Sequence, residues 1–365
     1  MIVFSHRDDP HAYCVQYHAD RLGLPFSIVP WHELTTLATA SLTIDHDRVS
    51  MRWSDKLQDI ELGDAKTVWS RRYLSRPVPQ AADHRDHSFI RRQSGNFENF
   101  ALSAILPNAR WINPYAAQRR AMSKIWQLSV ACDVGFSIPK TIVTNNPEHV
   151  RSFFDSFKEH GIIAKPLEAD HWFEDGIGFQ TYTTRLEQVD IEEDDAIIFS
   201  PMIYQSHIPK MFELRCTVIG TTVFCAKLHT QNDELNSIDS RNFRTPLDLK
   251  IEPFELPGSV KEKLLLMINR MGLVFGAFDF AVTPEGELIF FEVNESGQWL
   301  WIEHLCPDIP LLNAFLRFAY EPYGLSEEVS GVSYDGNLLK SLFDKELTLI
   351  QGNFIPDKPE NRLVW

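Results

Sequence analysis

Apolar and polar positions over the first thirty residues predict a strand, a helix and a second strand. The apolar run Ile2–Phe4 has the length of a buried strand. A helix is expected over residues 10–22, where Gly23 ends it, and a second strand over 26–29. Weaker signals of both kinds continue to Pro114, so the first third predicts an α/β domain with a parallel sheet.

A helical stripe follows this domain. Ala121, Ile125, Leu128 and Cys132 lie at i, i+4, i+7 and i+11, the spacing of one helix face. Gly135 provides a natural stop just beyond the stripe. This pattern predicts a helix with those four residues on its buried side.

The middle of the chain predicts short strands around a second helix. Asn146 followed by Pro147 is a strong helix start, between strands at 138–143 and Ile162–Lys165. Residues 170–184 are polar and small and contain Gly176 and Gly178, which predicts a mobile loop.

Further strand signals occupy the next hundred residues. We expect a strand at 197–199 and a hairpin that joins 213–219 to 223–228 through Gly220-Thr221. A charged segment at 230–246 has no clear pattern, and a helix is expected over 259–271.

Two alternating apolar runs between Phe278 and Asn294 flank the turn sequence Pro284-Glu285-Gly286 and predict a β-hairpin. If Thr283 pairs with Leu288, Asp279 faces Glu292 across the strands. Residues two apart share a sheet face, so Asn294 joins them.

Three oxygen ligands on one face suit Mg²⁺, which keeps water and substrate phosphates as its other ligands. The alternative is a surface hairpin with solvated acids. The apolar neighbours favour the metal site, since they make both strands look buried and buried acids need partners. These neighbours are Phe278, Phe280, Phe290, Phe291 and Val293.

Composition sets the class of protein. The 365 residues are too many for one small core and indicate two or three domains. A content of 44% hydrophobic and 23% charged residues is typical of a soluble globular protein. The net charge of −15 argues against a general nucleic-acid binder, because phosphate backbones need clustered Lys and Arg.

Cysteine usage and hydropathy predict the cellular compartment of the protein. The five cysteines form no CxxC pair, which argues against a disulfide framework or a structural zinc site and fits a reducing cytoplasm. The chain starts without an apolar stretch of signal-peptide length, and no apolar run could span a membrane. We therefore expect a soluble, cytoplasmic protein without membrane or nucleic-acid partners.

The polar residues near these elements predict phosphoryl chemistry. The chain has no P-loop and no Rossmann glycine motif. Two lysines (Lys124 and Lys165), a glycine loop, Arg215 and the acidic hairpin could together neutralise phosphate charge. Ordinary alternatives exist: Lys124 could be solvated, the glycines could form a surface loop, and Arg215 could face solvent from a strand.

In this order, the residues resemble the ATP-grasp superfamily. More narrowly they resemble the graspetide (microviridin-type) maturases, ATP-grasp ligases that modify ribosomally made peptides. The stretches that carry the resemblance are 68–72, 111–114, 121–128, 135–141, 164–167, 272–280 and 292–303.

The resemblance implies nucleotide-binding roles. Lys124 and Lys165 would contact the ATP phosphates, and the loop around Gly176 and Gly178 would close over the triphosphate. Adenine would be bound by backbone groups around Gln205, Ser206 and Ile208. Ribose would be bound by the acid Glu213.

It also implies catalytic and metal-binding roles. Arg215 would steady the transferred phosphoryl group. Segment 239–241 keeps the acid and the arginine, Arg241, of a motif that often reads Asp-Trp-Arg in the family. The Mg²⁺ ligands would be Asp279, Glu292 and Asn294.

The implied architecture is an α/β (α+β) ATP-grasp fold. An N-terminal α/β domain with a parallel sheet would span 1–118, and a small central lid lobe 119–205. A C-terminal lobe with an antiparallel sheet and the Mg²⁺ site would span 206–323, followed by an extension over 324–365.

The implied reaction is ATP-dependent. A carboxylate would attack the γ-phosphate, and an amine or alcohol would then displace phosphate from the acyl phosphate. The preferred substrate is a precursor peptide that gains side-chain amide or ester crosslinks. A small amino acid or dipeptide substrate, or a non-catalytic ATP-binding module, is the alternative, and the resemblance also allows a homodimer.

Overall fold

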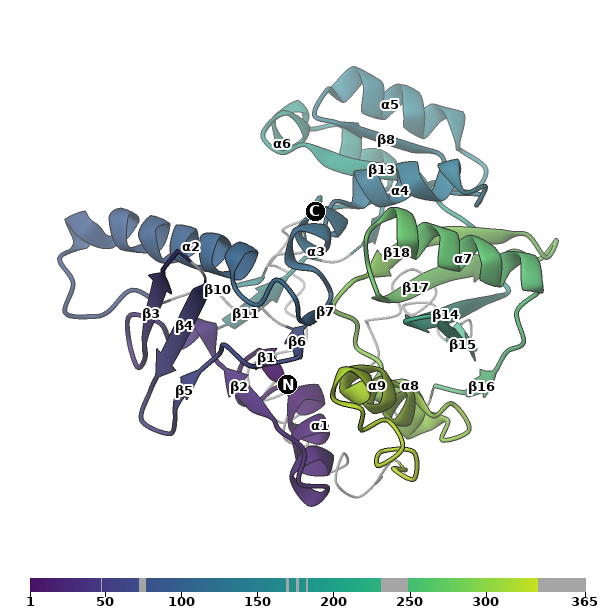
Figure 1. The fold of residues 1–365 in the computed structure, drawn as a ribbon. Coiled ribbons are helices and arrows are strands. Elements are labelled where there is room, and N and C mark those ends of the chain that lie inside the picture. Colours follow the sequence, from purple (N-terminus) through teal and green to yellow (C-terminus); the bar gives the residue numbers. More distant parts are fainter. Residues whose placement is uncertain are drawn as a thin grey trace.

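The structure is a computed structural model that describes residues 1–46, 48–71, 77–168, 171–174, 177–181, 183–230 and 249–333, of which 171–174 and 177–180 by backbone alone. Gly176, Arg241 and most of the predicted C-terminal extension lie outside the described residues. Figure 1 shows an N-terminal domain at the left, a small central lobe at the top and a C-terminal lobe at the right.

The N-terminal domain is built on a parallel sheet in the order β2-β1-β6-β7, as the sequence predicted. An antiparallel meander, β3-β4-β5, shares its core and was not anticipated from the pattern. The elements are β1 (Ile2–Phe4), α1 (Pro10–Arg21), β2 (Ser27–Val29), β3 (Thr39–Ile44), β4 (Val49–Ser54), β5 (Asp59–Glu61), β6 (Thr67–Ser70), α2 (His87–Ala104), β7 (Arg110–Ile112) and α3 (Tyr115–Ala121).

The central lobe is an antiparallel sheet in the order β12-β9-β13-β8 with two helices on one face. The predicted cap is confirmed, because Asn146 Oδ1 accepts from the Glu148 amide at 2.9 Å. The elements are β8 (Thr141–Thr144), α5 (Pro147–Ser156), β9 (Ile162–Lys165), β12 (Thr184–Arg185), α6 (Asp194–Ile198) and β13 (Met202–Ser206).

Two predictions for this lobe are wrong. Residues 197–199 do not form a strand, since Ile197 and Ile198 end helix α6 after an acidic first turn. The expected loop at 170–184 contains a two-stranded hairpin, β10 (His171–Glu174) and β11 (Ile177–Gln180), in which Gly178 pairs with Phe173. The β-forming aromatic residues of these short runs outweigh the glycine signal.

The C-terminal lobe is a five-stranded antiparallel sheet in the order β16-β15-β14-β17-β18. The predicted hairpin through Gly220-Thr221 and the helix at 259–271 are confirmed within one residue. The elements are α4 (Lys124–Asp133), β14 (Phe212–Ile219), β15 (Thr222–Leu228), β16 (Ile251–Pro253), α7 (Gly258–Arg270), β17 (Phe275–Val282), β18 (Leu288–Asn294), α8 (Leu300–Leu305) and α9 (Leu311–Tyr320).

Helices α4 and α7 cover one face of this sheet. Leu128 and Met267 share a buried cluster with Leu214, Phe278 and Phe290. Alternate residues of β14 and β17 therefore point to the other face. One end of that second face is covered by α8 and α9, where Phe315 contacts Phe275, and its other end carries the polar residues of the site.

Helix α4 differs from its predicted stripe. Leu128 and Ala121 are buried, but Ile125 is 49% exposed and Cys132 is also exposed. A new helix begins at Lys124 after the cap Ser123, so Ala121 belongs to the preceding helix α3. The break rotates the buried face, while the stop at Gly135 is confirmed by its φ of +84°.

One hydrophobic cluster joins the N-terminal domain to the C-terminal lobe. Val3 and Val15 belong to the same buried cluster as Trp299 and Phe315. This shared core fixes the ends of the parallel strands against the second face of the C-terminal sheet. Within the described ranges, no helix has the length and apolarity needed to span a membrane.

Candidate active site

The β17-β18 hairpin brings the predicted metal ligands together. Asp279 pairs with Glu292, and Ala277 pairs with Asn294. Nearer the turn the predicted register is wrong, because Leu288 pairs with Val282 and not with Thr283. A bulge between Asp279 and Phe280 shifts the register by one residue and restores the predicted pair.

Arg215 lies beside this pair on β14, directly opposite Asp279. Its Nη1 donates to both carboxylate oxygens of Asp279, at 2.7 and 2.6 Å. Asn294 Nδ2 donates to Asp279 Oδ2 at 3.0 Å, and Lys124 Nζ lies 3.7 Å from Glu292 Oε2. Five predicted site residues from four elements thus meet at one end of the second sheet face.

The carboxyl group of Asp279 has a raised pKa. Burial raises its pKa from 3.8 to about 6; the Arg215 guanidinium opposes that shift and the Glu292 carboxylate adds to it. Burial likewise raises the pKa of the neighbouring Glu295. Burial thus destabilises both ionised carboxyl groups, and a bound cation would offset that cost.

The donor set fits a hard divalent cation. Asp279, Glu292 and Asn294 offer carboxylate and amide oxygens, without thiolate or imidazole. In the part of the chain that the structure describes, no group of three His, Cys, Asp or Glu side chains gathers in a metal-binding arrangement. A site with two acids and one amide suits Mg²⁺, which takes its remaining ligands from water and phosphate.

Glu213 lies on the same face of β14 as Arg215, two residues away. Its carboxylate forms an ion pair with Lys210, and both side chains are nearly buried. The acid expected at the ribose is therefore held near the start of β14, opposite Ala281 of β17.

The remaining nucleotide candidates belong to the central sheet. Lys165 ends β9 and is 8% exposed, and it pairs with Ile203. The α5 side of this sheet is lined by Ala164 and Tyr204, so the alternating Lys165 and Gln205 point to the opposite face. Gln205 Nε2 donates to the Thr141 hydroxyl at 2.9 Å.

The strand that carries two of the adenine candidates, Gln205 and Ser206, ends before the third. Strand β13 stops at Ser206, and Ile208 lies beyond it. The Ser206 and His207 amides already donate to the carbonyls of Lys140 and Gly161, at 2.9 and 3.0 Å. Of the three residues predicted at adenine, Ile208 therefore has the backbone least committed to the sheet.

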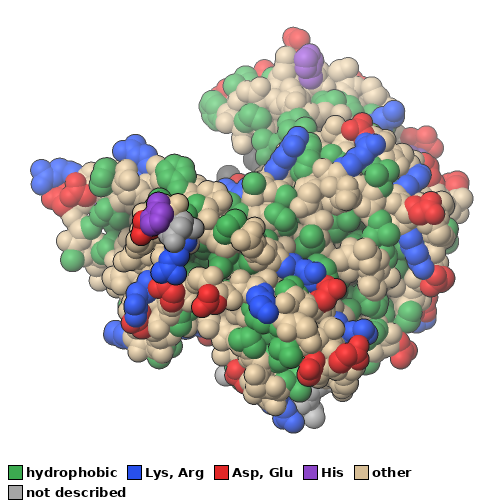
Figure 2. Space-filling view, in the orientation of Figure 1, with side chains coloured by type: hydrophobic (Ala, Val, Ile, Leu, Met, Phe, Trp, Pro, Cys, Tyr) green, Lys and Arg blue, Asp and Glu red, His purple; other side chains and the backbone are tan. Residues whose placement is uncertain are grey.

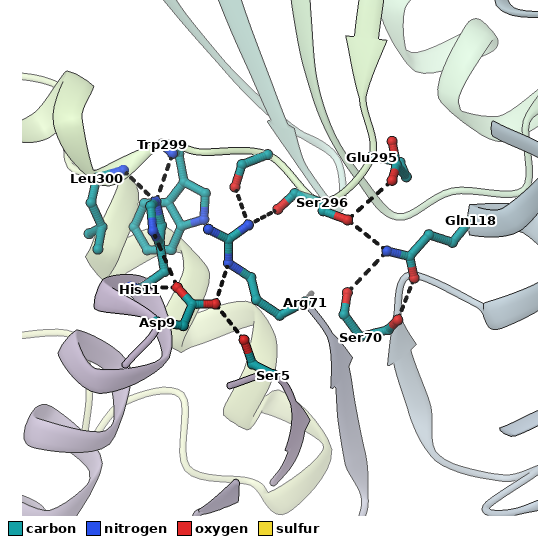
Figure 3. Close-up of polar contacts among 11 residues, drawn as sticks. Ser5, Asp9, His11, Ser70, Arg71, Gln118, Glu295, Ser296, Trp299 and Leu300 are labelled. Atoms are coloured by element: carbon teal, nitrogen blue, oxygen red, sulfur yellow. Dashed lines mark hydrogen bonds and ion pairs between the residues drawn. The ribbon is translucent and has the colours of Figure 1, made fainter. Parts of the chain in front are cut away.

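Sequence reasoning gave no role to a buried polar network beside the site (Figure 3). Ser5 and Arg71, which Figure 3 labels, come after β1 and β6. Asn113, whose side chain binds the Glu295 carbonyl, comes after β7. Polar residues at the carboxyl ends of parallel strands commonly mark a ligand site, and that signal was present in the sequence. All three are buried.

Comparisons with known proteins find solved structures of the same fold. No protein-family model and no curated protein sequence matches the chain. A solved RiPP-associated ATP-grasp ligase of Chryseobacterium gregarium, in complex with ADP and a leader and core peptide, aligns with a TM-score of 0.79 and 26% identity, over 88% of this chain and 96% of that one. The protein is an ATP-grasp ligase.

Two further structures align with this ligase at similar levels. The macrocyclase MdnC of Microcystis aeruginosa, bound with precursor peptide MdnA, has a TM-score of 0.77 and 25% identity over 88% of this chain and 100% of that one. The macrocyclase MdnB of the same organism aligns with a TM-score of 0.73 and 26% identity, over 87% of this chain and 98% of that one. The predicted ATP-grasp fold and ligase class are confirmed.

A D-cycloserine synthetase, DcsG, shares the fold alone, with a TM-score of 0.52 and 14% identity. The ligase is thus much closer in structure to the peptide-modifying enzymes than to this small-molecule synthetase. Figure 2 shows the surface of the ligase indented where the central lobe at the top meets the N-terminal domain at the left.

Proposed function

We propose that this ATP-grasp ligase activates side-chain carboxylates of a ribosomally made precursor peptide and joins them to amine or hydroxyl groups of the same peptide. The observation that carries the proposal is the acidic hairpin with Arg215 bound to Asp279. It occurs in a fold whose structural relatives include ligases bound to leader, core or precursor peptides.

The reaction balances in two steps. A carboxylate oxygen attacks the γ-phosphorus of ATP, and the bond to the β-phosphate oxygen breaks to release ADP. An amine or hydroxyl then attacks the acyl carbon, inorganic phosphate leaves with the bonding electrons, and the nucleophile loses its proton. One water equivalent is removed from the peptide for each bond that forms.

Charge stabilisation is the task of the protein side chains. Asp279, Glu292 and Asn294 would hold Mg²⁺, which withdraws charge from the phosphate oxygens when bound. Lys165, a nearly buried cation, would offset phosphate charge from the central lobe.

Arg215 is the best candidate to contact the transferred group. Within the described residues its buried Nε–H has no hydrogen-bond partner, although Nη1 is fixed by Asp279. A guanidinium that is oriented at one end and keeps a free donor at the other suits a phosphoryl or acyl-phosphate oxygen.

Mass spectrometry of a candidate precursor peptide tests the proposal. Short peptides encoded beside the gene are incubated with purified ligase and MgATP, and we expect loss of one or more waters. Glu292→Gln should abolish that loss, whereas Glu285→Gln, at the exposed turn of the same hairpin, should not.

A peptide that binds but never loses water with MgATP would contradict the proposal. MgATP turnover stimulated by free amino acids without any peptide would move the assignment to a small-molecule ligase.

A further inference from the structure

The loop between β18 and α8, residues 295–299, connects the metal-site hairpin to the rest of the lobe. Side chains of the N-terminal domain bind several of its backbone groups (Figure 3). Asn113 Nδ2 donates to the Glu295 carbonyl at 2.7 Å. His11 Nε2 accepts from the Trp299 and Leu300 amides at 3.0 and 3.2 Å.

The centre of this loop is bound by one guanidinium. Arg71 Nη1 donates to the carbonyl oxygens of Ser296 and Gly297, at 2.5 and 2.8 Å. Its Nε lies 3.2 Å from Asp9 Oδ2, and the two side chains are 1% and 0% exposed. Asp9 in turn accepts from the Ser5 hydroxyl at 2.6 Å.

The same loop reaches the reacting groups. The Gln298 carbonyl accepts from Arg215 Nη2 at 3.3 Å, so the loop holds the second terminal nitrogen of the guanidinium whose Nη1 binds Asp279. Gly297 lies directly on the sheet, where an added Cβ would be 2.7 Å from the Phe275 ring. A shift of the loop therefore moves Arg215 as well.

Burying an ion pair costs desolvation free energy, which the attraction between the charges can fail to offset. Apolar residues of similar volume often stabilise a fold equally well or better. A guanidinium can, however, fix two successive carbonyls in one geometry, which an apolar side chain cannot do. The Asp9–Arg71 pair is thus better explained by the position it gives the loop than by stability alone.

We propose that Arg71 is a positioning residue for the ligase reaction. It fixes the carbonyls of Ser296 and Gly297, and the loop then fixes Arg215 beside Asp279. This inference rests on the proposed function for its kinetic consequence, but its structural consequence is independent of the substrate.

Three full-length variants test the inference. Arg71→Met removes the guanidinium that links Asp9 to the loop. Arg71→Lys keeps the charge but offers one nitrogen in place of Nη1, which binds the carbonyls, and Nε, which faces Asp9. Arg110→Met is the matched control, because Arg110 also links the N-terminal sheet to the C-terminal lobe. Its Nη1 donates to the Phe318 carbonyl at 2.8 Å and pairs with Glu321, away from the loop.

We expect Arg71→Met to lower kcat by about 100-fold and Arg71→Lys by about 10-fold, with KM for MgATP nearly unchanged, because the reacting groups lose their alignment. Amide hydrogen exchange over 297–300 should become faster in both. Arg110→Met should lower the melting temperature without changing kcat or loop exchange.

Wild-type kcat in both Arg71 variants would overturn the inference, and so would an equal loss of kcat in Arg110→Met. If Arg71→Met does not fold, the kcat and loop exchange of Arg71→Lys decide whether the inference holds. A wild-type ligase that never dehydrates the peptide contradicts the proposed function instead, and loop exchange then tests the positioning role alone.

Discussion

The ligase places two arginine–aspartate pairs on either side of one loop, and they differ in how far they are closed to solvent. Asp9–Arg71 is closed to solvent, and Asp9 also accepts from Ser5 and the His11 amide. In Asp279–Arg215 the aspartate side chain is 30% exposed and a second carboxylate, that of Glu292, stands beside it.

We interpret Asp9–Arg71 as a pair that positions the loop, and Asp279–Arg215 as a pair that is available to bind ligands. The buried pair has its partners within the protein, so its geometry is fixed before any substrate arrives. In the second pair the Asp279 side chain is partly exposed and burial of its carboxyl group raises its pKa. Under the proposed function, substrate and metal would complete the second pair.

The largest expected effect is on stability, and it should appear at the buried pair. Arg71→Met should lower the free energy of unfolding by about 3–5 kcal/mol, because it leaves Asp9 buried and uncompensated. Urea unfolding measures this, with Arg52→Met on the exposed Arg52–Asp59 pair as control. That control should cost less than about 1 kcal/mol, and equal losses would erase the distinction.

The next effect is on turnover at the exposed pair. Arg215→Met should lower kcat by about 10²–10³-fold, as expected when a donor to developing charge is removed. The free energy of unfolding should change far less than in Arg71→Met, since Asp279 can take up a proton. Steady-state kinetics and urea unfolding on the same preparation check both, and a stability loss as large as that of Arg71→Met would contradict it.

A smaller effect should follow from disturbing the loop between the pairs. Gly297→Ala places a methyl group against Phe275 at a φ of +36° and should cost about 1–3 kcal/mol of unfolding free energy. Gly286→Ala is the control: its φ is also positive, at +84°, but nothing lies within 4 Å of the new methyl. If both variants lose the same stability, the close packing of the loop on β17 is not the cause.

The smallest effect is a pH dependence of the metal-free protein. The pKa of Asp279 is about 6 in the fold against 3.8 unfolded, so the fold binds this proton more tightly. Its contribution is present below pH 4 and is lost as pH rises through about 6. Urea unfolding at pH 4.5 and 7, in the presence of a chelator, should show this loss in wild type and not in Asp279→Asn.

The acidic hairpin was predictable because its information is local. Alternation has a period of two residues, and a short turn brings the strands back upon themselves. Asp279 and Glu292 could therefore be paired from sequence, although the turn register was wrong by one and a bulge corrected it. The cap at Asn146 and the strand ending at Lys165 are equally local.

The sequence by itself thus determined the strand and helix order around the acidic hairpin, the oxygen-rich donor set, and through its motifs the family resemblance. Tertiary structure alone decided which residues surround that hairpin. Arg71 and Ser296 are 225 positions apart, and Arg215 and Asp279 are 64 apart. Contacts at such separations depend on how whole sheets pack, and no local period or propensity encodes that packing.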